Sequence, residues 1–510
     1  MSRIKKAFKA TAVGQVFAML AMLLSLVAVP LYLQWLGQER YGLLLTGMAF
    51  GSYLMFADGG LTWASMLLIA EASGREDRVE IASIVKCSLS LAGCSTLLVA
   101  VIVTGLVMSL KLMSPVAWLP SHPEFSGLLI VLGLSTGLNL LFSPFYNLLF
   151  GLQDAHLATA YQGVGRLVGT VLMLVIARQG CSLAWIFAGN VFGGLLVSLA
   201  VAWHCRRRHS WAFSHGSFWN GAQIRRQLRM SVKSFIMQIG SILWGTAPVL
   251  AISGAAGPQA VPAYTVPVAL LNAPFGLLTS FCANLQAGYG EAMGRGDREW
   301  ITKTIAALLR KAALLIGLLG TGYMLLAEAF IGLWTHGHLQ SDPLMLLSAL
   351  VIVSMGTVLS FFRYALTGIN RHRNAALADL ICGLLCFVFV FLSVRFYGPG
   401  WVGAGVAVAV ILSSGWMLPV ELSRALQRRR IWPAWSFWAR LVVVMLMSGI
   451  AGWLSMKSMV GDGILAWGRI LVSGSVCFGV YSSLSFWLFS EDVMPIKTAL
   501  ASYRKGLQVK

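Results

Sequence analysis

Runs of about 20 or more apolar residues recur along the whole 510-residue chain. A helix of about 20 residues crosses a hydrocarbon core about 30 Å thick, and its backbone hydrogen bonds are satisfied internally. The composition agrees, because 58% of the residues are hydrophobic and only 11% are charged. Soluble domains average about 25% charged residues. The sequence therefore predicts an all-α polytopic membrane protein and excludes a water-soluble fold.

The apolar runs predict fourteen transmembrane helices. The first run follows a basic N-terminal segment but is too long for the apolar part of a signal peptide, so we expect it to be retained. The expected helices cover residues 11–34, 42–70, 87–111, 127–151, 158–178, 183–203, 231–256, 263–289, 304–330, 344–368, 375–395, 401–421, 437–457 and 464–489.

The formal net charge of +20 would indicate nucleic acid in a soluble protein. Here 30 of the 38 Lys and Arg residues fall in alternate segments that share one side of the membrane, and five fall on the other. Cytoplasmic loops carry such an excess of basic residues. We therefore expect a multi-pass protein of the bacterial inner (cytoplasmic) membrane with both termini in the cytoplasm. The run from Arg206 to Arg208 is interpreted as an orientation anchor, and no nucleic-acid partner is expected.

An internal repeat is indicated by two similar stretches. Residues 143–151 read SPFYNLLFG and residues 360–368 read SFFRYALTG, 217 positions apart. Arg178 and Arg395 keep the same spacing, and Pro30 and Pro248 differ by 218. The alternative is chance similarity among apolar residues. A parallel repeat predicts a six-helix bundle at 1–205, a basic linker at 206–230, a second six-helix bundle at 231–425, and two additional helices with a tail at 426–510.

Prolines within the predicted spans are candidates for helix interruptions. Proline removes a backbone donor and kinks a helix unless neighbouring groups satisfy the freed carbonyl. Pro267 and Pro274 lie in the eighth span, and Pro30 and Pro248 occupy matching positions in the first and seventh. We expect these four prolines to mark gating positions, and static kinks used for packing are the alternative.

Charged residues inside predicted spans are the best functional candidates, because each costs at least about 2.5–3.5 kcal/mol at a helix centre. We expect Arg166, Arg363 and Lys233 to line a cationic cavity that binds substrate. An arginine suits phosphate or pyrophosphate because its planar fork donates two hydrogen bonds and keeps its charge. Asp58 and Asp379 are expected to pair with these cations or to carry a coupling proton. Structural salt bridges and snorkelling are the alternatives.

Catalytic and cofactor motifs are missing from the sequence. It contains no phosphate-binding loop of the form GxxxxGK[ST] and no grouping that indicates a nucleophile or paired catalytic carboxylates. His336 and His338 have no complementary ligands nearby, and the eight cysteines form no CxxC pair. We therefore expect neither an enzyme nor a protein with a metal or another cofactor.

The stretch VPLYLQWLGQERYGLLLTGMAFGSYLMFADGGL at residues 29–61 resembles the opening of the O-antigen and exopolysaccharide flippases. These form the polysaccharide transporter family of the multidrug/oligosaccharidyl-lipid/polysaccharide exporter superfamily. AGPQAVPAYTV at residues 256–266 is similar to the second-half counterpart. The resemblance implies two six-helix bundles around a cavity and alternating access. It also implies a substrate of oligosaccharide on undecaprenyl pyrophosphate, moved from the cytoplasmic to the periplasmic leaflet. The fourteen expected spans exceed the usual twelve of the O-antigen flippases. In this number the chain resembles the lipid II flippases of the same superfamily.

A lipid-linked oligosaccharide flippase is therefore the expected function. Its partners would be the bilayer, a polyprenyl-pyrophosphate-linked glycan, and the polymerase and chain-length proteins of polysaccharide biosynthesis. A multidrug or metabolite exporter of the same superfamily is one alternative, although it should favour acidic cavity residues. A polysaccharide polymerase or ligase is another, and short outer loops argue against it.

Overall fold

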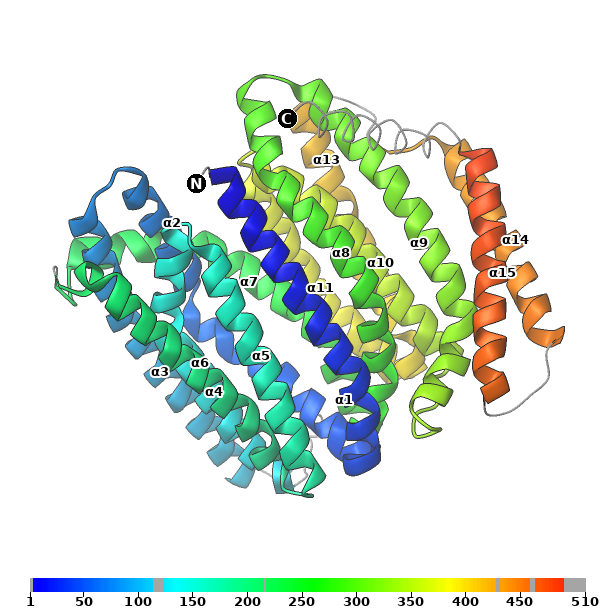
Figure 1. The fold of residues 1–510 in the computed structure, drawn as a ribbon, viewed down its shortest axis with the longest axis horizontal. Helices are drawn as coiled ribbons and strands as arrows, with labels where there is room; N and C mark the ends of the chain where they lie inside the picture. The colour runs from blue at the N-terminus through cyan, green and yellow to red at the C-terminus, as the bar shows by residue number, and fades with distance from the viewer. Residues whose placement is uncertain (1–2, 113–122, 215–216, 428–431, 459–463, 490–510) are drawn as a thin grey trace. The chain divides into compact units, whose positions relative to one another are not determined.

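The computed structural model describes residues 3–112, 123–214, 217–427, 432–458 and 464–489, and these residues form only helices and their connections (Figure 1). The expected all-α membrane fold is confirmed. The α-helices are α1 (Arg3–Leu54), α2 (Leu61–Gly74), α3 (Arg78–Leu112), α4 (Pro123–Gly151), α5 (Ala155–Arg178), α6 (Leu183–Arg208), α7 (Gly221–Ala256), α8 (Val261–Gly294), α9 (Arg298–Trp334), α10 (Pro343–Gly368), α11 (His372–Tyr397), α12 (Val402–Leu412), α13 (Ser414–Leu426), α14 (Trp435–Ser458) and α15 (Ile464–Leu488). Four 3-10 helices join them: η1 (Met55–Asp58), η2 (Ser210–Phe213), η3 (Pro258–Ala260) and η4 (Pro399–Trp401).

Thirteen helical segments of the described chain are long and apolar enough to cross a membrane. The first, Ala12–Asp58, has 47 residues and contains non-helical Gly37, where two helices are joined across a kink. It therefore accounts for the first expected span and most of the second. The expected span at 401–421 is also not one continuous helix, because Ser413 (φ −135°, ψ −104°) separates α12 from α13.

Contacts divide the chain into two compact units. Unit 1 comprises Met1–Pro262 and Asp379–Pro399, and unit 2 comprises Ala263–Ala378 and Gly400–Lys510. In unit 1, α3 packs on α4 and α5 packs on both α6 and α1. In unit 2, α14 and α15 run side by side and both pack on α9 (Figure 1). The six-helix bundle boundaries expected from the sequence remain a prediction.

Two glycines in unit 1 support the internal repeat. Gly37 has φ 72° and ψ 171°, and Gly257 has φ 85° and ψ 163°. Only glycine adopts this region of backbone space readily. Gly257 follows the end of α7, and Gly37 joins the two parts of α1, so each ends a long apolar helix. The two positions lie 220 residues apart, inside the two stretches (29–61 and 256–266) that resemble the first-half and second-half segments of the flippase family.

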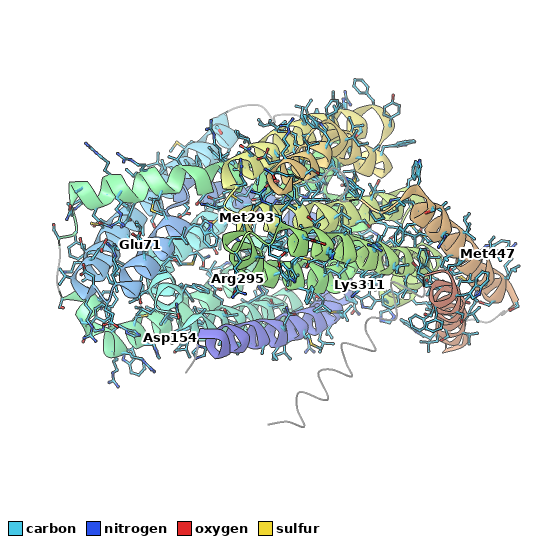
Figure 2. The ribbon with its side chains drawn as sticks, turned by 90° about the horizontal axis from the view of Figure 1, so that it is seen from above. Glu71, Asp154, Met293, Arg295, Lys311 and Met447 are labelled. Atoms are coloured by element: carbon cyan, nitrogen blue, oxygen red, sulfur yellow. The ribbon has the colours of Figure 1, made fainter. Side chains whose placement is uncertain are left out.

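A repeated turn supports the same relationship between the two halves. Residues 71–80 read EASGREDRVE and residues 291–300 read EAMGRGDREW, again 220 positions apart. In both turns an aspartate side chain accepts a backbone hydrogen bond at the start of the next helix: Asp77 from Glu80 N at 2.8 Å and Asp297 from Trp300 N at 3.0 Å. The residue before each aspartate has positive φ, 58° at Glu76 and 76° at Gly296. Glu71 and Arg295 mark the two copies in Figure 2.

The four prolines expected to interrupt helices do not end them. Pro30 lies within α1, Pro248 within α7, and Pro267 and Pro274 within α8. The kink in α1 is seven residues beyond Pro30, at Gly37. Helical dihedrals persist around a proline when only one backbone donor is lost, whereas the φ of Gly37 is incompatible with a helix. A role for these prolines in gating remains a prediction.

Candidate functional site

Asp58 lies at a break between helices rather than inside one. The expected span at 42–70 is divided by η1 and by Gly59 and Gly60, whose φ values are 57° and 77°. The Asp58 side chain accepts hydrogen bonds from Thr62 N at 3.2 Å and from Thr62 Oγ1 at 2.7 Å. The carboxylate therefore caps the N-terminus of α2, where the helix dipole favours negative charge.

Polar side chains surround a small cavity beside this carboxylate in unit 1. The space at its centre is about 10 Å³, which is close to the room that one water molecule needs. Asp58 itself is only 6% exposed. The lining combines hydroxyl, amide and carboxylate groups from η1, α2, α3, α4 and α7: Asp58, Thr62, Ser65, Ser88, Ser95, Ser143, Asn147 and Gln227.

Two amide side chains fix the polar lining. Asn147 of α4 donates from Nδ2 to Ser65 Oγ at 2.9 Å. Gln227 of α7 is fully buried, donates from Nε2 to the Ile84 carbonyl at 3.2 Å, and accepts from Ser88 Oγ at 3.3 Å. A buried amide with both ends bonded is held in one orientation. The cavity is therefore a preorganised polar site between helices of unit 1.

An ion-pair cluster ties the start of α7 to the repeated turn between α2 and α3. Arg226 pairs with Glu71 at 2.9 Å and with Glu80, and Arg75 pairs with Glu80 at 2.9 Å. The Glu80 side chain is 18% exposed and joins both arginines. In the second copy of the turn, the position of Glu80 is occupied by Trp300.

The residues expected to form a cationic cavity are distributed over both units. Arg166 lies at the middle of α5 in unit 1 with an exposed side chain, and Arg363 lies on α10 in unit 2 with a half-buried one. Lys233 is within α7, but its side chain lies outside the described atoms. Asp379 is buried in α11, where its backbone lies against Gly240 of α7. The cavity that Arg166, Arg363 and Lys233 were expected to line remains a prediction, and so does the expected role of Asp58 and Asp379 as charge partners or carriers of a coupling proton.

An apolar groove opens in unit 2 where α14 approaches α9, α10, α12 and α13. Its volume is about 610 Å³. The lining is aliphatic and aromatic, including Ile316, Met355, Val358, Trp416 and Trp438. The groove therefore offers a site for a long apolar chain.

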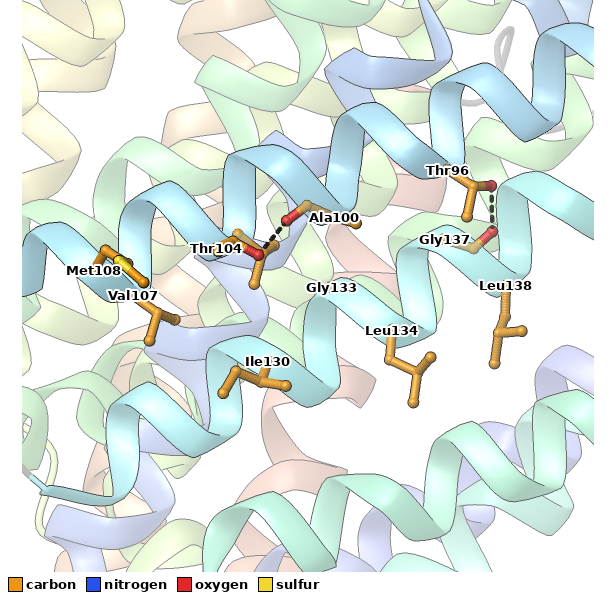
Figure 3. A pocket seen from close by; sticks show the side chains of 11 residues that line it. Thr96, Ala100, Thr104, Val107, Met108, Ile130, Gly133, Leu134, Gly137 and Leu138 are labelled. Atoms are coloured by element: carbon orange, nitrogen blue, oxygen red, sulfur yellow. Dashed lines mark hydrogen bonds between the residues drawn. The ribbon is translucent and has the colours of Figure 1, made fainter.

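A second apolar groove lies between α3 and α4 of unit 1 (Figure 3), with a volume of about 580 Å³. Thr96 Oγ1 donates to the Gly137 carbonyl at 3.0 Å across the two helices, and Thr104 bonds within α3 to Ala100 at 2.8 Å. Its hydroxyls are thus already satisfied. What remains exposed in this groove is apolar.

The family of the chain is decided by a match of residues 8–284 to the model of the "Polysaccharide biosynthesis protein" family. The chain belongs to this family. No curated protein sequence matches it.

The fold is that of known transporters. "Lipid II flippase MurJ, inward closed conformation" is similar with a TM-score of 0.72 and 14% identity, over 94% of this chain and 99% of that one. An inward-facing multidrug resistance MATE family transporter of the MOP superfamily has a TM-score of 0.65 and 16% identity, over 82% and 100% of the chains. A MOP superfamily transporter from Pyrococcus furiosus has a TM-score of 0.54 and 17% identity, over 84% and 98%. At these identities the likeness shows the all-helical transporter fold.

Several residues of the polar cavity were not expected from the sequence. Asn147 and Gln227 stand among apolar or basic neighbours and carry no motif. One signal was present: Gln223, Gln227 and Ser231 recur at four-residue spacing in α7, and all three are buried. That spacing places them on one helix face and could have predicted a buried polar stripe.

Proposed function

We propose that this protein is a flippase that moves an undecaprenyl-pyrophosphate-linked oligosaccharide, an O-antigen or exopolysaccharide repeat unit, from the cytoplasmic to the periplasmic leaflet. The observation that carries the proposal is membership of the polysaccharide biosynthesis family, combined with a transporter fold. A polysaccharide pathway that builds its units on a lipid inside the cell needs a step that carries them across the membrane. Alternating access of a helical transporter provides such a step.

The unit 2 groove supports the lipid part of this substrate. Moving one CH₂ group from lipid to water costs about 0.8 kcal/mol, so a long polyprenyl chain stays in an apolar environment throughout transport. The groove beside α14 has about 610 Å³ of largely apolar space. In our proposal the tail follows this groove while the pyrophosphate and sugars cross through a polar path.

Arg363 is the proposed contact for the pyrophosphate, with Arg166 and Lys233 as further cationic residues. Arg363 is half-buried in a membrane helix, and its planar guanidinium can donate two hydrogen bonds to a pyrophosphate. In the same proposal Asp379 balances this charge when substrate is absent, and Pro30, Pro248, Pro267 and Pro274 act as flexible points during alternation.

The proposed setting is the bacterial inner membrane, with both termini cytoplasmic as the distribution of Lys and Arg predicts. Polysaccharide polymerase and chain-length proteins would act on the product and are the proposed protein partners. In this account the protein moves its substrate without catalysing a chemical reaction.

Substitution of Arg363 tests the proposed pyrophosphate contact. Arg363→Lys keeps the charge and loses the fork, and Arg363→Ala loses both. We expect glycolipid flipping to fall several-fold in the first variant and at least tenfold in the second at equal membrane abundance. Arg395→Ala, an exposed arginine at the end of α11, is the matched control and should keep normal activity. Full activity in both Arg363 variants would contradict the proposal.

A multidrug or metabolite exporter is the second candidate, favoured by the similarity to MATE transporters. The two candidates differ in the chemistry of the substrate. Binding of organic cations by the purified protein, with no binding of polyprenyl pyrophosphates, would favour export of drugs.

A further inference from the structure

We propose that the polar cavity beside Asp58 is a binding site for one sodium ion. The carboxylate of Asp58 is 6% exposed in a segment long and apolar enough to span the membrane. Among the described side chains Asp58 has no ion-pair partner, and its carboxylate accepts hydrogen bonds from Thr62 and from the backbone N–H of Gly60. These hydrogen bonds leave the net negative charge inside the membrane, and a bound cation would neutralise it.

Neutral oxygen atoms face the carboxylate across the cavity. Asn147 uses its amide nitrogen to bind Ser65, which leaves Oδ1 available. Ser95 and Ser143 line the same space and make no hydrogen bond to another described residue. Carboxylate, amide and hydroxyl oxygens are the ligands that hard cations prefer.

The charge and the size of the site select the ion. One carboxylate neutralises one positive charge, whereas a divalent cation would leave an unbalanced charge inside the membrane. The accessible space of about 10 Å³ suits an ion no larger than a water molecule. Na⁺ fulfils both conditions. Unwound backbone segments provide cation sites in other transporter folds, and Asp58 lies at an unwound segment.

The internal repeat shows how far the two halves differ around this cavity. At a separation of 220 residues, the positions of Asp58, Ser65, Ser88 and Ser95 in the second half are occupied by Leu278, Leu285, Leu308 and Leu315. Leu278 lies inside the continuous helix α8, whereas Asp58 lies at the break before α2, so the break and the polar groups at these four positions belong to the first half alone. A helix break that exposes a carboxylate to a polar cavity inside a membrane span is expected to bind a ligand.

The site can be tested on the purified full-length protein with ²²Na⁺ at pH 8. We expect saturable binding of about one ion per chain and at least a tenfold loss of affinity in Asp58→Asn, which keeps the shape of the cap. Asn147→Leu should weaken binding as well. Asp297→Asn is the matched control, because Asp297 caps α9 at an exposed site without a cavity.

Each outcome decides the proposal. Binding by wild type and Asp297→Asn, but not by Asp58→Asn, supports a sodium site, provided that the variants elute as folded protein. Absence of saturable binding in wild type, or equal binding by Asp58→Asn, overturns it and leaves the cavity to water or a proton. If the protein is the proposed flippase, the ion is its coupling ion. The binding test needs no glycolipid, so sodium binding without flipping would reject only the proposed function.

Discussion

Gly37 and Gly257 share one backbone conformation, with φ of 72° and 85° and ψ of 171° and 163°, at positions 220 residues apart. Each glycine turns the chain at the end of a long apolar helix. The segments that follow the two turns contact each other in unit 1. Gly42, after Gly37, lies so close to the carbonyl of Pro258, after Gly257, that a side chain would not fit. The repeat is therefore visible in backbone geometry where few side chains are identical.

Alanine at either glycine tests the importance of this conformation. A Cβ at Gly37 would meet no atom within 4 Å, so its cost is conformational strain alone. We expect Gly37→Ala and Gly257→Ala each to destabilise the protein by about 1–3 kcal/mol. Thermal unfolding in detergent measures this loss. Gly245→Ala, in open space on helical α7, should be neutral or stabilising, and equal stability of all three variants would contradict the argument.

Filling the unit 2 groove tests the proposed path of the lipid tail. Met355→Trp places a large ring in the groove, and we expect several-fold slower flipping of a long-chain glycolipid with little effect on a short-chain analogue. Leu134→Trp in the unit 1 groove is the matched control and should not slow transport. Slowing by Leu134→Trp alone would assign the tail to the other groove.

Removal of Glu80 tests the cluster that joins the repeated turn to α7. Glu80→Gln leaves Arg75 and Arg226 without their shared partner, and we expect a loss of about 1 kcal/mol that shrinks at high salt. Glu299→Gln is the control, since its pair with Lys303 (2.8 Å) is exposed. We expect Glu299→Gln to change the free energy of unfolding by no more than about 0.5 kcal/mol. Chemical denaturation at low and high salt would show whether the two variants differ.

His209 gives stability a dependence on pH. This residue follows α6 outside the membrane span, and burial lowers its pKa below the ordinary value of 6.5, although nearby Asp154 opposes the shift. The unfolded chain binds a proton more readily, so the stabilising contribution is complete above about pH 6.5 and is lost on acidification through the lower folded pKa. We expect His209→Gln to reduce the difference in melting temperature between pH 8 and pH 5. The loop variant His336→Gln should leave it unchanged.

Much of the fold could be predicted from the sequence because membrane spans are long and apolar. The expected helices from residue 87 to residue 395 correspond to α3 to α11, while two breaks were missed. The two breaks lie at residues 58–60 and at Ser413, inside spans whose hydropathy stays high. Because hydropathy does not depend on backbone conformation, it could not reveal them. The four prolines were expected to interrupt helices, but they lie inside them. Loss of one backbone N–H donor at a proline disturbs a helix less than a positive φ such as that of Gly37, which no helix permits.

The candidate site was predicted only in part. Asp58 was found because a charge in an apolar run is conspicuous, whereas Asn147 and the serines resemble ordinary residues of membrane helices. Their importance depends on which helix faces meet around Asp58, and one sequence cannot give that packing. The turn at Glu71–Arg78 and Glu291–Arg298 was detectable, since six of its eight positions are identical at one spacing.

The central claim is tested most directly by the sidedness of lipid-linked intermediates in cells that lack this gene, with and without a plasmid copy. The account predicts that undecaprenyl-linked repeat units accumulate on the cytoplasmic leaflet, that surface polysaccharide is lost, and that the plasmid restores both. Unchanged sidedness with normal surface polysaccharide would contradict a flippase function.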